Sequence, residues 1–149
     1  MTTTPNRSVV APPETIYTLI TQLLGHHVTS DADAYRLVGE GLTVKTIKHL
    51  IGALKIPASL IAPQTTIRRR YKDRSPFSSA ESERALRLAR VYAEAQLLFQ
   101  DEAATLEWFH KPVTLVPGQE AIAPMELAAT ETGARLVEAK IRRTAFGLL

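Results

Sequence analysis

The segment QTTIRRRYK, residues 64–72, holds the side chains of this sequence best suited to bind nucleic acid. The planar fork of an arginine can engage phosphates or the O6/N7 edge of guanine. Glutamine and threonine near a helix start are short enough to reach base edges in the major groove. We therefore expect a DNA-binding face formed by Gln64, Thr65, Thr66, Arg68, Arg69, Arg70 and Lys72.

These side chains do not all point the same way on a helix. Arg68 and Lys72 share one face at helical spacing, and Arg69 lies about 100° further round. Some of the cations are therefore only solvated. The alternative to a DNA-binding helix is a charged surface helix beside a linker.

Charge is unevenly distributed along the 149 residues. Residues 1–44 carry a net charge of −2, residues 45–90 of +8 and residues 91–149 of −3. A basic middle between two acidic ends favours one DNA-facing element in a protein whose other surfaces have another role.

Other site chemistry finds little support. Cysteine is absent, which excludes disulfides, thiolate metal sites and cysteine nucleophiles, and is typical of a reducing cytoplasm. The histidines, His26, His27, His49 and His110, do not pair at the three- or four-residue spacing of a metal site on a helix. Glycine-rich phosphate loops and serine-nucleophile motifs are also absent. We expect no catalytic residue, no metal site and no cofactor of the protein's own.

The apolar spacing predicts an all-α protein. Residues 1–13, with three prolines, are expected to form a flexible tail. Gly25 is expected to end the first helix, and Gly39 and Gly41 the second. Pro63 is expected at the first position of the basic helix, joined to the preceding helix by a tight connection, and Ser78 with Glu81 predicts a capping box. The first predicted helix begins after Pro13 and stops at Gly25, and the third runs from Thr43 until Pro57 ends it. The other predicted helices cover residues 30–40, 64–72, 79–99, 102–109, 124–127 and 130–144. No apolar run approaches the length of a membrane span, so we expect a cytoplasmic protein.

Three segments, in order, resemble one known family. SSAESERALRLARVYAEAQLLFQDEAATLEWFHKP and PMELAATETGARLVEAKIRRTAFGLL resemble the C-terminal domain of the Xre/MbcA/ParS antitoxins, the partners of RES-domain toxins. APQTTIRRR, residues 62–70, is similar to the recognition segment of that family. Together the resemblance spans roughly residues 40–149. The matching positions include Ser82, Arg84, Leu88, Ala89, Arg90, Ala95, Phe99, Ala104, Trp108, Pro112, Pro124, Leu127, Thr130, Gly133, Ala134, Val137, Ile141, Phe146 and Gly147.

The resemblance implies a type II antitoxin with two parts. Residues 14–77 would form an Xre-like helix-turn-helix DNA-binding domain, and residues 78–149 a small helical toxin-binding domain. Such a protein neutralises a RES toxin that consumes NAD or transfers ADP-ribose, and represses its own operon. The implied toxin-binding residues are at the C-terminal end: Arg142, Arg143, Phe146, Gly147, Leu148 and Leu149.

Alternatives remain open at this point. The apolar end could insert into the toxin's active-site cleft, or form a last helical turn packed on the protein's own core. A helix-turn-helix protein that reads a palindromic operator is expected to be a homodimer. A free-standing repressor without a toxin, or an adaptor whose basic stretch is only solvated, would share many of the same features.

Overall fold

The computed structural model describes residues 15–147, and this part of the chain is all-α, as predicted. One isolated bridge, between Val113 and Ile122, is its only β-type pairing. The expected tail at 1–13 lies outside the described residues. The elements are α1 (Ile16–Leu24), α2 (Asp31–Glu40), α3 (Val44–Leu54), the 3-10 helix η1 (Ala58–Leu60), α4 (Gln64–Asp73), α5 (Ser79–Phe99), α6 (Glu102–His110), α7 (Pro124–Leu127) and α8 (Glu131–Ala145).

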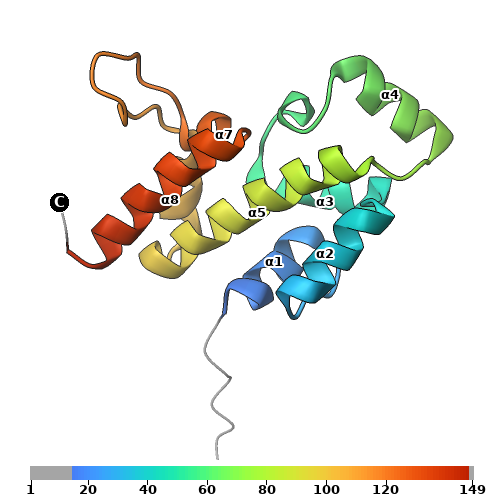
Figure 1. Ribbon diagram of the computed structural model, residues 1–149, viewed down its shortest axis with the longest axis horizontal. Helices are drawn as coiled ribbons and strands as arrows, with labels where there is room; N and C mark the ends of the chain where they lie inside the picture. The colour runs from blue at the N-terminus through green and yellow to red at the C-terminus, as the bar shows by residue number, and fades with distance from the viewer. Residues whose placement is uncertain (1–14, 148–149) are drawn as a thin grey trace, which may run out of the picture.

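The 21-residue helix α5 runs through the middle of the molecule (Figure 1). Helices α1, α2 and α3 pack against it from one half of the chain, and α6 and α8 from the other. Fully buried alanines, such as Ala85, Ala89 and Ala93, let these neighbours approach closely. One hydrophobic core therefore includes residues on both sides of the predicted boundary at 77/78. The division at 77/78 stays a prediction about which part of the chain binds DNA and which part binds a toxin.

Local capping explains where the helices begin. Ser30, Thr43 and Thr130 each accept a hydrogen bond from the backbone N–H three residues further along. The predicted capping box of Ser78 and Glu81 is present at the start of α5. These caps satisfy N–H groups that have no partner within the helix, so the starts can be predicted from nearby residues alone.

Two glycines permit close approaches that a side chain would block. Gly41 has a φ of +87°, and a Cβ there would lie 2.3 Å from the Phe77 carbonyl oxygen. A Cβ at Gly133 would lie 2.0 Å from the carbonyl oxygen of Leu127, so this glycine allows α8 to pack on α7. Both distances are far below van der Waals contact, so neither position can accept a side chain without movement of the backbone.

Three local expectations were wrong. Gly39 does not break α2, which continues to Glu40 and ends at Gly41. Pro63 precedes α4 in an extended conformation instead of taking its first helical position. The connection from α3 to α4 covers residues 55–63 and contains η1, so it is not tight. Burial explains the longer path, because Ile56, Ile61 and Ala62 all lie in the core.

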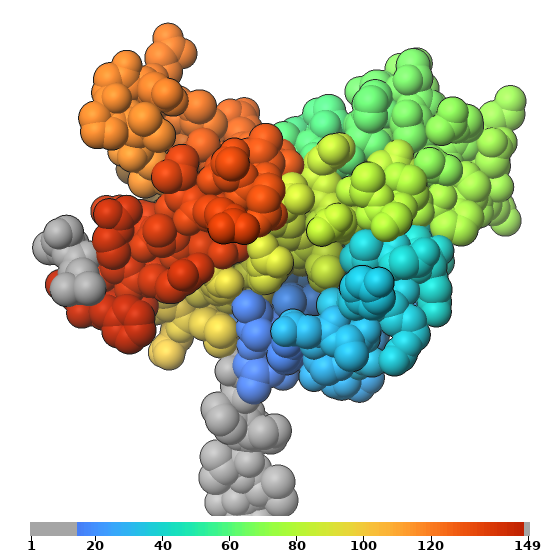
Figure 2. Space-filling view, in the orientation of Figure 1, coloured from blue at the N-terminus to red at the C-terminus, as the bar shows by residue number. Residues whose placement is uncertain are grey.

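Two parts of the surface protrude from the body of the molecule. Figure 2 shows α4, in green, at one corner, and the segment between α6 and α7, in orange, at another. Within residues 15–147, no helix combines the length and the apolar character needed to cross a membrane.

Candidate nucleic-acid interface and C-terminal end

Helix α4 is attached to the body of the protein by a narrow inner face. Ile67 is its only buried residue. Arg70 reaches α5, where its Nε and Nη2 atoms lie 3.1 and 3.0 Å from Oε1 of Glu81. The Arg70 guanidinium also lies 6.0 Å from the centroid of the Phe77 ring. Arg70 therefore links α4 to α5, unlike the other predicted DNA-binding cations.

The Glu81 carboxylate has two partners at once. Its Oε1 accepts the backbone N–H of Ser78 at 2.8 Å in the capping box, in addition to the guanidinium of Arg70. Partial burial raises the pKa of Glu81, but the Ser78 hydrogen bonds and the Arg70 charge outweigh it and lower the pKa below its usual value. A charged Glu81 thus both starts α5 and holds α4.

The outer face of α4 carries unpaired cations. Arg68, Arg69 and Lys72 are exposed, and none forms an ion pair with a described residue. Gln64 and Thr65 are also exposed near the helix start, whereas Thr66 is half-buried. The face therefore combines free positive charge with short polar side chains, which is what a contact with DNA requires.

The arginines of α5 have partners inside the protein. Arg84 donates to the carbonyl oxygen of Ile61 at 2.6 Å, just before α4. Arg87 donates to the Ala129 carbonyl oxygen at 3.1 Å, and Arg90 pairs with Glu138 of α8 at 3.1 Å. These three residues account for part of the basic middle of the sequence without adding to the face of α4.

The C-terminal end of the described chain is exposed. Arg142 pairs with Glu138 at 3.2 Å, and Arg143 lies on the surface. Phe146 is 77% exposed, so its ring is not packed on the protein's own core. Gly147 has a φ of +71°, a conformation that favours glycine. Leu148 and Leu149 lie outside the described residues.

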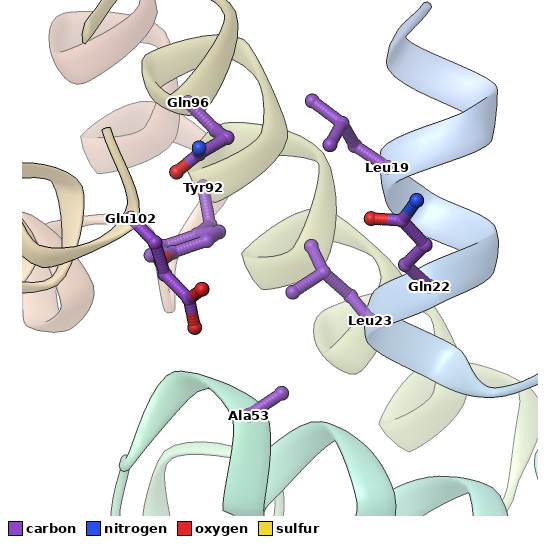
Figure 3. Close-up of a pocket in the computed structure, with 7 residues that line it drawn as sticks. All are labelled: Leu19, Gln22, Leu23, Ala53, Tyr92, Gln96 and Glu102. Carbon is purple, nitrogen blue, oxygen red and sulfur yellow. The ribbon is translucent and has the colours of Figure 1, made fainter. Parts of the chain in front are cut away.

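A cavity of about 280 Å³ lies between α1, α3, α5 and the start of α6 (Figure 3). Tyr92, Gln96 and Glu102 line one side, and Leu19 and Leu23 of α1 the other. Oε1 of Gln96 is buried and has no hydrogen-bond partner among residues 15–147. Burial and, to a smaller extent, the charge of Glu102 raise the pKa of Tyr92 to about 12, so its hydroxyl stays protonated. The lining lacks the paired base and nucleophile of a catalytic site.

The structure also places cations that the expected face did not include. Lys45 and Lys48 of α3 and Arg74 at the end of α4 line a second cavity between these helices. The signal in the sequence was the three-residue spacing of the two lysines, which puts both on the polar side of one helix.

No model of a known protein family matches the chain. Over 123 residues it is 29% identical to a protein of Pseudomonas putida (strain KT2440) named antitoxin Xre. The chain is similar to a named antitoxin. The matched region covers 80% of this chain and 76% of that protein, so the similarity extends over most of both.

Proposed function

We propose that this protein is the antitoxin of a type II toxin–antitoxin system. The observation that carries the proposal is its similarity to antitoxin Xre over 80% of the chain. The ordered resemblance of residues 40–149 to the Xre/MbcA/ParS antitoxins supports the same conclusion and favours a RES-domain toxin as the partner. The protein acts by binding, and NAD is the substrate of the toxin.

Repression of its own operon would use the outer face of α4. Arg68, Arg69 and Lys72 are exposed and have no acidic partner among the described residues, so they can replace the counterions of a DNA backbone. A homodimer would present two such faces to a palindromic operator. Sedimentation of the protein at micromolar concentration tests this, and a monomer both with and without toxin would refute it.

Neutralisation would use the C-terminal end of α8. The exposed ring of Phe146 is an apolar anchor, and the positive φ of Gly147 lets the chain turn after it. The last two residues are leucines. An apolar end of this kind can fill a cleft of the toxin and block access of its substrate.

Co-expression with the product of the neighbouring gene tests the function directly. We expect the two proteins to co-purify, and cells carrying both to grow. Deletion of residues 145–149 should restore toxicity, while circular dichroism and DNA binding stay unchanged, because the residues from Arg142 to Gly147 are exposed.

A pair of point variants makes this test more specific. Phe146→Ala should weaken protection, whereas Tyr35→Ala should not, because Tyr35 is an equally exposed aromatic residue on α2. Full protection by the truncated protein would show that the end of α8 is not the blocking element. A neighbouring gene that encodes no RES domain, together with intact operator binding, would favour a free-standing repressor.

A further inference from the structure

A basic groove separates α3 from α4. Its cavity of about 460 Å³ is lined by Thr43, Val44, Lys45, Lys48, Tyr71 and Arg74. The two helices that form it are joined by the long connection through η1, so residues about 30 positions apart in sequence share one surface.

The groove has positive charge and no compensating carboxylate in its lining. Lys45, Lys48 and Arg74 are exposed, and none of them pairs with an acidic group among residues 15–147. The Nζ atom of Lys48 lies 4.6 Å from the centroid of the Tyr71 ring. This cation–π contact orients the Lys48 side chain but supplies no negative charge, so the N–H donors of the lysine remain available to an anion.

The groove is continuous with the outer face of α4. Tyr71 lies between Arg70, on the inner face, and Lys72, on the outer face. At 100° per residue, Arg68 is about 60° from Tyr71 around the helix axis, so it borders the groove. A nucleic acid that contacts Arg68 and Lys72 therefore passes the mouth of the groove.

The short turn before α3 supports a role for this helix at the same interface. Gly41, Leu42 and Thr43 are the only residues between α2 and α3, and a three-residue turn with glycine is typical of a helix-turn-helix. The longer connection before α4 lacks this feature. The second helix of a helix-turn-helix faces DNA, which favours α3 at the interface. The exposed cations of α4 favour that helix at the same interface.

We infer that the groove between α3 and α4 binds the phosphodiester backbone of DNA, next to the DNA-binding outer face of α4. The inference rests on the proposed DNA binding and adds a second helix to it. Lys45, Lys48 and Arg74 contact phosphates, which set the position of the protein on the duplex but do not distinguish sequences.

Fluorescence anisotropy with the full-length protein and two labelled duplexes tests the inference. One duplex carries the promoter of the protein's own gene, and the other is an unrelated sequence of the same length. The variants are Lys45→Gln with Lys48→Gln, and Arg74→Gln alone. Lys140→Gln is the matched control, because this exposed lysine lies on α8. Each titration is repeated at several salt concentrations.

We expect the double variant to bind both duplexes more weakly by the same factor, on the order of 10- to 100-fold. The magnitude of the negative slope of log affinity against log salt, called the salt slope below, should fall by about 2, because each lost phosphate contact removes about 0.9. Arg74→Gln should lower it by about 1. Lys140→Gln should change neither quantity.

Three results would overturn the inference. An unchanged salt slope would show that these cations do not touch phosphates, and a loss confined to the promoter duplex would assign them to bases. If the groove variants weaken protection against the toxin but leave DNA binding intact, the groove binds protein. If the proposed DNA binding itself is wrong, the wild-type protein will bind neither duplex. This outcome differs from failure of the groove inference, in which wild type still binds.

Discussion

Arg68 and Arg69 of α4 differ from Arg84, Arg87 and Arg90 of α5 in what surrounds them. The first pair projects from a helix that protrudes from the body and has no acidic partner in the described chain. The second set reaches carbonyl oxygens or carboxylates of other elements. The basic middle of the sequence therefore contains two populations of arginines. Those of the first are free to bind a partner, and those of the second already stabilise the fold.

Replacing the two arginines that are free to bind a partner should have the largest effect, on DNA binding. Replacing both Arg68 and Arg69 by alanine should lower operator affinity by about 100-fold and the salt slope by about 2. Stability should not change, because both side chains are exposed and neither forms an ion pair within residues 15–147. Gel-shift titrations at several salt concentrations measure the effect, and thermal unfolding provides the control. Unchanged affinity and slope would contradict the assignment of α4 to DNA.

Replacing an arginine of the second population should have the opposite result: stability should fall, and the salt slope of DNA binding should stay unchanged. Arg87 is 15% exposed, donates to the Ala129 carbonyl and pairs with Glu131 at 3.3 Å. Arg87→Ala should lower the free energy of unfolding by about 1 to 2 kcal/mol, mostly through the lost hydrogen bond, since water screens the half-exposed Glu131. Urea unfolding measures it. A fall in the salt slope of DNA binding would show that Arg87 belongs to the first population.

The pair of Arg70 and Glu81 lies at the border between the two populations. Glu81→Gln can keep the capping box but loses the charge that holds Arg70, and should cost about 1 kcal/mol. Because the pKa of Glu81 is lowered in the folded protein, its contribution is present at neutral pH and is lost as pH falls through that lowered pKa.

Urea unfolding as a function of pH checks this sign. The Glu81→Gln variant should lose less stability on acidification than wild type. Arg70→Gln should have a similar cost, and the double variant should cost less than the sum of the two. A drop in the DNA salt slope for Arg70→Gln would instead make Arg70 a phosphate contact.

An effect of similar size but opposite sign is expected at a polar group that has no hydrogen-bond partner in the described part of the chain. Oε1 of Gln96 is buried beside Tyr92 in the cavity under α1 (Figure 3). Gln96→Leu should raise the free energy of unfolding by about 1 kcal/mol, because an apolar side chain removes an unsatisfied acceptor. Thermal unfolding measures the gain, with Gln22→Leu on the exposed side of the same cavity as the control. Destabilisation by Gln96→Leu would indicate that the amide has a role in the cavity.

Particular elements show how far sequence patterns reach. The starts of α2 and α5 could be predicted because each depends on a serine, Ser30 or Ser78, three residues before the N–H that it caps. Thr43 and Thr130 cap α3 and α8 in the same way, but those two helices were expected from apolar spacing alone. The length of the connection from α3 to α4 was not predicted, because it depends on the burial of Ile56 and Ile61 against elements distant in the chain. Packing of the apolar end on the protein's own core was one of two open alternatives, and only the tertiary structure shows that the Phe146 ring is not packed in this way.

The order of the helices and the concentration of positive charge in the middle of the chain were determined by sequence alone. Both depend on local rules, since helices form through bonds four residues apart and caps act within one turn. The tertiary structure decided which cations are free. Arg69 and Arg70 are neighbours in sequence, but only Arg70 meets Glu81, because the fold brings the start of α5 against one face of α4. Availability to a partner depends on such contacts between distant residues, and local pattern does not encode them.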